Sequence, residues 1–121
     1  PPLPEALREL FVHSEPVPTF ALEGAPRPLP PGIEHALFRA AQEGLTNIRK
    51  HAHANRALVR LDFRAPSHVV LELSDNGVGA NGAHGGFGLQ GLRERIEVIG
   101  GTLNAANRLE GGFALRVEVP A

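Results

Sequence analysis

The chain has no cysteine in its 121 residues. This absence excludes disulfide bonds and a cysteine nucleophile, and it suits a protein of the cytosol. No apolar run approaches the roughly 20 residues of a membrane-spanning helix, and no signal peptide opens the sequence. We therefore expect a cytoplasmic domain that makes no membrane contact itself, although a parent protein could be membrane-anchored.

The sequence also lacks an excess of charge of either sign. Its formal net charge is -1, from 12 basic and 13 acidic residues. No basic block or aromatic-studded basic stripe appears, so nucleic acid is not an expected partner. The six histidines are not spaced as a zinc-type cluster. With 42% hydrophobic residues, residues 1–121 suit one domain with a single core. The start at Pro1-Pro2, without Met, suggests a domain cut from a longer protein.

Apolar periodicity predicts both helices and strands along the chain. Helices are expected over about residues 4–12, 33–52 and 89–99, and strands over 17–22, 56–63, 69–75, 102–108 and 113–119. Residues 24–32 hold four prolines and are expected to form an extended connector before the long helix. The strands 56–63 and 69–75 are expected to pair as a hairpin.

The long helix carries a polar residue on its apolar face. At about 100° per residue, Asn47 falls between Ala36 and Ala40, with Glu43 one turn earlier at the edge of the face. An unpaired buried carboxamide costs about 1–3 kcal/mol. Asn47 is therefore expected to bond either to nearby backbone, as most buried polar groups do, or to a ligand.

A second polar residue points inward at the end of the strand 69–75. Asp75 continues the apolar side of that strand at a period of two. The residues that follow include Gly77 and Gly79, whose backbone freedom would let a flat ligand approach the main chain. An Asn-Gly hairpin turn with a solvated Asp is the alternative interpretation. The inward phase of Asp75 favours the ligand.

A glycine-rich segment leads into the last helix. Residues 80–85 are small, polar and expected to be mobile, and Gly86, Gly88 and Gly91 surround the helix start. Free backbone N–H groups and the helix dipole can bind phosphates there. The segment is no Walker A loop, and no repeated strand–helix units support a dinucleotide-binding fingerprint. An ordinary loop-to-helix junction fits the three glycines equally well.

Taken together, the three segments resemble the N, G1 and G2 boxes of the GHKL superfamily of sensor histidine kinases, type II topoisomerases, heat-shock chaperones and mismatch-repair ATPases. The matching residues are Gln42-Glu43-x-x-Thr46-Asn47-x-x-Lys50-His51-Ala52, Asp75-x-Gly77-x-Gly79 and Gly86-x-Gly88-Leu89-x-Gly91-Leu92-x-x-Arg95. The first box and the final strand look like the catalytic domain of histidine kinases whose response regulators commonly carry helix-turn-helix domains. The resemblance covers almost the whole chain.

This resemblance implies an α/β fold, namely a two-layer α/β sandwich in which a mixed, mostly antiparallel sheet is covered on one face by three helices. It also implies binding of ATP with Mg²⁺. Asp75 would accept a hydrogen bond from the adenine amino group, while Gly77 and Gly79 let the base and ribose lie close. Asn47 would be the one side-chain ligand of Mg²⁺, beside phosphate oxygens and water.

Further roles follow from the same resemblance. Lys50, the only lysine in the chain, would contact the phosphates, and His51 would lie beside the nucleotide unless it is simply a surface or packing residue. The triphosphate would be held at the end of a short lid formed by Gly86, Gly88, Leu89 and Gly91. Glu43 matches the residue that activates water in the ATPase branches and is a candidate base.

The implied function is transfer of the ATP γ-phosphoryl group to a histidine on a separate helical domain of the same protein, which would then act on a response regulator. No histidine here has a phosphoacceptor setting, so the domain alone should bind ATP without phosphorylating itself. One departure concerns the adenine site, because Phe113 follows Gly112 where such domains often have a Thr.

Three alternatives stay open from the sequence. The domain could belong to another GHKL ATPase, including a serine-directed anti-sigma-factor kinase. It could be a nucleotide-binding interaction module without catalysis, which Phe113 favours and intact Glu43 and Asn47 oppose. A purely structural domain would require all three boxes to be coincidental.

Overall fold

The computed structural model describes residues 2–77 and 89–121, apart from the side chains of residues 51 and 52. The described elements are helices α1 (Leu3–Val12), α2 (Pro31–Asn47) and α3 (Leu89–Val98), a π-helix η1 (Ile48–Ala52), and strands β1 (Thr19–Glu23), β2 (Ala57–Asp62), β3 (His68–Asp75), β4 (Thr102–Asn107) and β5 (Phe113–Pro120). None of the described helices combines the length and apolarity that crossing a membrane requires.

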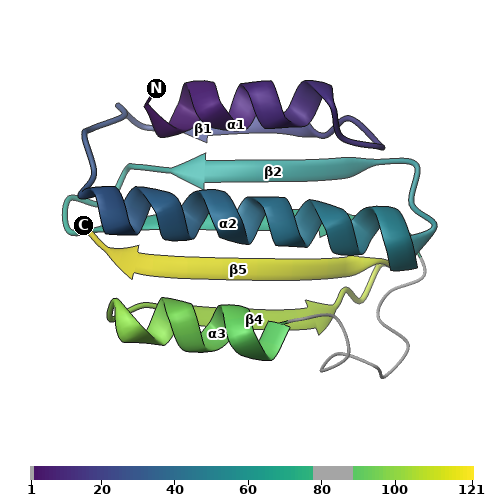
Figure 1. The fold of residues 1–121 in the computed structure, drawn as a ribbon. Helices are drawn as coiled ribbons and strands as arrows, with labels where there is room; N and C mark the ends of the chain where they lie inside the picture. The colour runs from purple at the N-terminus through teal and green to yellow at the C-terminus, as the bar shows by residue number, and fades with distance from the viewer. Residues whose placement is uncertain (1, 78–88) are drawn as a thin grey trace.

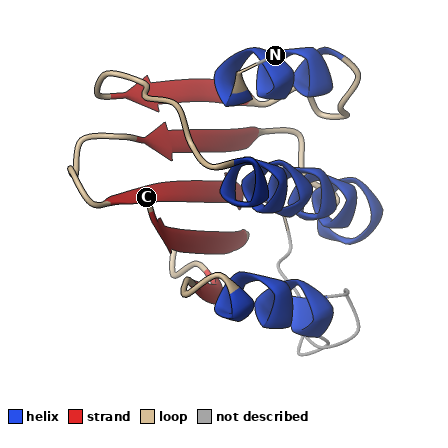
Figure 2. Ribbon diagram, turned by 60° about the vertical axis from the view of Figure 1, so that its left-hand side comes forward, coloured by secondary structure: helices blue, strands red, loops and turns tan. Residues whose placement is uncertain are grey.

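The strands form one mixed sheet in the order β1-β2-β3-β5-β4. Strand β1 runs parallel to β2, and the other neighbours are antiparallel. Helices α1, α2 and α3 lie side by side on one face of this sheet, as the two views show (Figures 1 and 2). The predicted two-layer α/β sandwich is confirmed.

Helix α2 crosses the middle of the sheet at unusually short range. A Cβ atom on Gly44 would lie 2.8 Å from Leu73 Cδ2 of β3 and 3.4 Å from Leu115 Cδ2 of β5. Leu37, on the same helix, is completely buried in the core. Because the glycine lets helix and sheet approach, the C-terminal end of α2 lies close to the sheet, on the side where β3 ends.

Strand β3 shows the alternation that the sequence predicts. Its apolar positions Leu71 and Leu73 are at most 2% exposed, and Asp75 completes the same buried face. The expected hairpin with β2 is confirmed, with Ala57 opposite Asp75 at one end of the pair. Strand β3 therefore delivers an acidic side chain into the helix-covered face at its C-terminal end.

The opposite face of the sheet is charged. Arg60 donates hydrogen bonds to Glu72 at 2.8 Å and to Glu23 at 2.6 Å across neighbouring strands. These bonds raise the pKa of Arg60 above its ordinary value, Glu23 contributing most. Side-chain hydrogen bonds from Arg64 hold the pKa of Asp62 below its ordinary value. This network marks the uncovered face as solvated.

The long helix differs from the prediction near its end. The α-helix stops at Asn47, and the expected last turn is the π-helix η1, which is followed by His53 with a left-handed φ of 51°. A π-turn has one more residue than an α-turn, so it shifts the side chains that follow it around the helix axis. Spacing alone cannot distinguish the two kinds of turn.

Candidate nucleotide-binding site

The buried carboxylate of Asp75 is the centre of the site. Its side chain is 2% exposed. One oxygen, Oδ1, accepts a hydrogen bond of 2.8 Å from the backbone N–H of Gly77. The other oxygen, Oδ2, is buried and has no hydrogen-bond partner within residues 2–77 and 89–121. The inward orientation of Asp75 is confirmed, and the alternative of a solvated Asp is wrong.

The turn between β4 and β5 packs against the backbone of Asp75. Arg108 donates a hydrogen bond of 3.0 Å to the Asp75 carbonyl. Gly112 has a φ of +92°, and a Cβ atom built on it would lie 1.9 Å from the same carbonyl oxygen. Only glycine can occupy this contact without a backbone shift. Arg108 could not be predicted from the sequence, because it is 33 residues from its acceptor and belongs to no motif.

Asn76 joins the end of β3 to the segment after η1. Its Oδ1 accepts bonds from the backbone N–H groups of Asn55 at 3.2 Å and Arg56 at 3.0 Å. Its Nδ2 donates to Asn55 Oδ1 at 2.8 Å. The Asn-Gly pair suggested only a turn, so this link was also missed. It fixes the distance between Asp75 and the helical segment that carries the other predicted ligands.

Three of the predicted ligands lie where α2 passes into η1. Asn47 is the last residue of α2 and is half-buried. Lys50 is exposed on η1, where a long cationic side chain can reach an anion in solution. The backbone of His51 belongs to η1, and its side chain lies outside the description. Single π-turns occur frequently at functional sites.

Glu43 lies one turn before Asn47 and is engaged by two arginines. Arg95 of α3 donates a hydrogen bond of 2.6 Å to Glu43 Oε1, and Arg39 of α2 lies 3.6 Å from the same oxygen. The Glu43 side chain is 25% exposed. The candidate base is therefore part of an ion-pair group that bridges α2 and α3, a contact that the motif alone did not predict.

The predicted phosphate-binding glycines are only partly described. Gly79, Gly86 and Gly88 lie outside the described residues, as does the segment 80–85 that was expected to be mobile. Leu89 is the first residue of α3 and is only 4% exposed. Its side chain belongs to the hydrophobic core, so any contact with phosphate would come from its backbone. Gly91 is in the first turn of α3.

These residues fit an adenine nucleotide. An adenine amino group could donate a hydrogen bond to Asp75 Oδ2, for which residues 2–77 and 89–121 supply no donor. The guanine carbonyl at the same ring position would instead place oxygen against oxygen. A bound Mg²⁺ needs few protein ligands, because phosphate oxygens and water supply most of its coordination. Across the described part of the chain, no three His, Cys, Asp or Glu residues are grouped to hold a metal.

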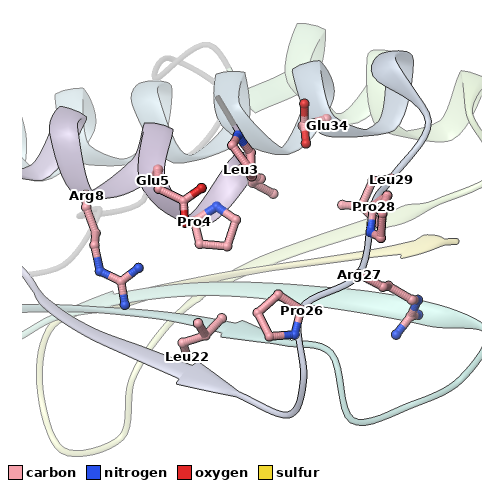
Figure 3. Close-up of a pocket in the computed structure, with 11 residues that line it drawn as sticks. Leu3, Pro4, Glu5, Arg8, Leu22, Pro26, Arg27, Pro28, Leu29 and Glu34 are labelled. Atoms are coloured by element: carbon pink, nitrogen blue, oxygen red, sulfur yellow. The ribbon is translucent and has the colours of Figure 1, made fainter.

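A separate cavity of about 680 Å³ lies at the other end of α2 (Figure 3). It opens between α1, β1 and the proline-rich connector, with Leu3, Leu22 and Leu29 among its lining residues. The guanidinium of Arg27 at its rim donates hydrogen bonds to the carbonyls of Phe63, His68 and Ala121. The guanidinium of Arg27 therefore bonds to the protein's own backbone. Neither Asp75 nor Asn47 lines this cavity.

A mixed sheet under three helices, with a buried acceptor at the end of β3 and an asparagine on the covering helix, is an α/β sandwich whose site fits an adenine nucleotide. The family model for histidine kinase-, DNA gyrase B- and HSP90-like ATPases matches residues 32–121. The chain belongs to this family of ATPase domains, and the family implies that the domain binds ATP.

Known proteins similar to the chain include sensor kinases. It is 33% identical over 91 residues to the sensor histidine kinase YxjM of Bacillus subtilis (strain 168), covering 75% of this chain and 22% of the relative. It is 34% identical over 94 residues to the signal transduction histidine-protein kinase/phosphatase DegS of Brevibacillus brevis, covering 75% and 24%. The chain thus spans about a quarter of the length of these curated relatives.

Among solved structures, the histidine kinase domain of the Erythrobacter litoralis EL346 blue-light activated histidine kinase shares the fold. The two superpose with a TM-score of 0.75 at 19% identity, covering 98% of this chain and 61% of that one. At this identity the likeness concerns the fold alone.

Proposed function

We propose that this domain is the catalytic, ATP-binding part of a two-component sensor histidine kinase. The observation that carries the proposal is the buried Asp75, whose Oδ2 lacks a hydrogen-bond partner in the described residues and fits the amino group of adenine. The kinases YxjM and DegS, each at least 33% identical over their matched regions, favour this branch of the ATPase family. We propose phosphoryl transfer as the activity of the longer parent protein.

The nucleotide would lie between β3 and the α2–η1 junction. Asp75 reads the adenine amino group, and Gly77 and Gly79 allow the base and ribose to approach the backbone. Lys50 and His51 would lie on the phosphate side. The backbone N–H groups of Gly86, Gly88, Leu89 and Gly91 would hold the triphosphate near the start of α3.

Asn47 is the proposed protein ligand of Mg²⁺. Its carboxamide oxygen would supply one bond to the ion, and a bound Mg²⁺ would supply charge neutralisation at the phosphates. The change Asn47→Asp adds a negative charge at this position, so we expect it to alter ATP affinity in the presence of Mg²⁺ more than in its absence. Equal changes in calorimetric titrations with Mg²⁺ and with a chelator would contradict the metal role.

Transfer requires an acceptor that these residues do not supply. An imidazole nitrogen on a helical domain of the parent would attack the γ-phosphorus, and the bond to the leaving oxygen of ADP would break. The histidine would become phosphorylated and release its N–H proton to water. Positioning and charge neutralisation provide most of such catalysis. The phosphoryl group then passes to a response regulator, and this domain works in the cytoplasm.

The proposal is tested by mixing this domain with the separately purified helical domain of its parent and ATP labelled in the γ-phosphate. We expect label on the helical domain in an acid-labile linkage, as a phosphoramidate requires, and no label when the acceptor histidine is replaced. Release of all label as inorganic phosphate would identify a hydrolase instead.

A further inference from the structure

The ion pair between Arg95 and Glu43 connects two parts of the proposed site. Arg95 Nη2 lies 2.6 Å from Glu43 Oε1, a charge-assisted hydrogen bond across 52 residues of sequence. Glu43 is one turn from Asn47 on α2, and Arg95 belongs to α3, whose first turn follows the glycine-rich segment. The pair therefore links α3 directly to α2, next to the core contacts of α3.

The position of Gly91 strengthens this interpretation. A Cβ atom on Gly91 would lie 3.6 Å from Arg95 Nη1 and in contact with it. The guanidinium of Arg95 thus folds back along α3 toward its first turn, the direction that helical side chains favour. The first turn, the guanidinium and the Glu43 carboxylate form one contiguous group.

We propose that Arg95 is a positioning residue that holds the first turn of α3 beside Asn47, with Glu43 as its anchor. The proposal rests on the proposed function, in which that turn contacts the nucleotide phosphates. It also assigns Glu43 a role other than activating water, because its Oε1 is occupied by the guanidinium of Arg95 and approached by that of Arg39.

Arg39 provides a matched control for this role. Its guanidinium lies 3.6 Å from the same oxygen, and its side chain is 47% exposed, against 54% for Arg95. Arg39 is on α2 itself, four residues before Glu43, so it cannot determine where α3 lies. Removing either arginine deletes one positive charge near Glu43, but only Arg95 links the two helices.

The first experiment compares ATP with adenosine, which has the base and ribose but no phosphate. We expect Arg95→Ala to weaken ATP binding about three- to fivefold, the upper part of the range for an exposed ion pair, and to leave adenosine binding within about twofold. Arg39→Ala should leave both affinities near wild type. Equal losses for both ligands with Arg95→Ala, or equal effects of the two arginine variants on ATP, would overturn the positioning role.

Charge exchange supplies the second experiment. Arg95→Glu alone should lower ATP affinity by about tenfold, because a like charge now faces Glu43. Combining it with Glu43→Arg should recover most of that loss. No recovery in the double variant would mean that Glu43 acts at the nucleotide itself, and would overturn its assignment as an anchor.

Amide spectra by NMR establish folding for each variant, since the chain has no Trp or Tyr to report by fluorescence. The wild-type titration separates the two proposals. If the wild-type domain binds no ATP, the proposed function fails. If it binds ATP and Arg95→Ala binds equally well, only the inference about Arg95 fails.

Discussion

Replacing Asp75 by Asn should change ligand binding and stability in opposite directions. The variant keeps an oxygen that can accept the Gly77 N–H bond of 2.8 Å. It removes a negative charge from a side chain that is 2% exposed and whose Oδ2 has no partner in the described residues. The carboxylate is therefore costly to the free domain and useful only when a donor arrives.

The magnitudes follow from these contacts. A hydrogen bond to a charged group contributes about 1.5–3 kcal/mol, so losing the adenine contact should weaken ATP binding about 10- to 150-fold. An unpartnered buried amide costs less than an unpartnered buried carboxylate. We therefore expect the free energy of unfolding to rise by about 1 kcal/mol, and Tm by roughly 4 °C.

Both quantities can be measured on the same preparations. Calorimetry measures the affinity for ATP. Far-ultraviolet circular dichroism, which reports helix content, measures the Tm of thermal unfolding. The matched control is Asp62→Asn, the same chemical change on the charged face of the sheet. It should leave ATP affinity unchanged. If Asp75→Asn bound ATP as well as wild type, or lost stability, Asp75 would be a structural residue and not the adenine acceptor.

Two further predictions concern stability. Gly112→Ala should destabilise the domain by about 2–4 kcal/mol, because the new Cβ would lie 1.9 Å from the Asp75 carbonyl oxygen. Gly111→Ala is the control, since Gly111 also has a positive φ but a Cβ built on it meets no atom within 4 Å. An equal loss of stability in both variants would show that only backbone strain matters. Arg64 holds the pKa of Asp62 below its ordinary 3.8, so Asp62 stabilises the fold at neutral pH and this contribution is lost as the pH falls toward the lowered pKa. Asp62→Asn should lower Tm at pH 7 and by progressively less below about pH 4, and a Tm difference that stays constant down to pH 2 would contradict this.

The local part of the fold was predictable because periodicity reports burial directly. Alternation along residues 69–75 predicted both strand β3 and the inward side chain of Asp75, and the structure confirms both. The apolar stripe of the long helix likewise predicted α2. These features depend on residues close in sequence, because the spacing of apolar residues shows which face of a helix or strand is buried.

The remaining features depend on contacts between distant residues. Arg108 reaches the Asp75 carbonyl across 33 residues and belongs to no motif, and Arg95 reaches Glu43 across 52 residues. Arg95 is part of the third motif, but the motif does not show that its partner is Glu43. The parallel pairing of β1 with β2 requires a crossover that periodicity does not specify. The π-turn at residues 48–52 keeps the helical pattern of the sequence and changes only the local geometry.

Adenine selectivity tests the central claim most directly. Calorimetric titration of the domain with ATP and GTP, each with and without Mg²⁺, measures whether the buried Asp75 and the half-buried Asn47 act together. The account predicts at least about tenfold tighter binding of ATP than of GTP, from one hydrogen bond gained and one oxygen–oxygen contact avoided, and stronger ATP binding with Mg²⁺. Equal affinity for the two nucleotides would contradict the account, because Asp75 would then not read the base.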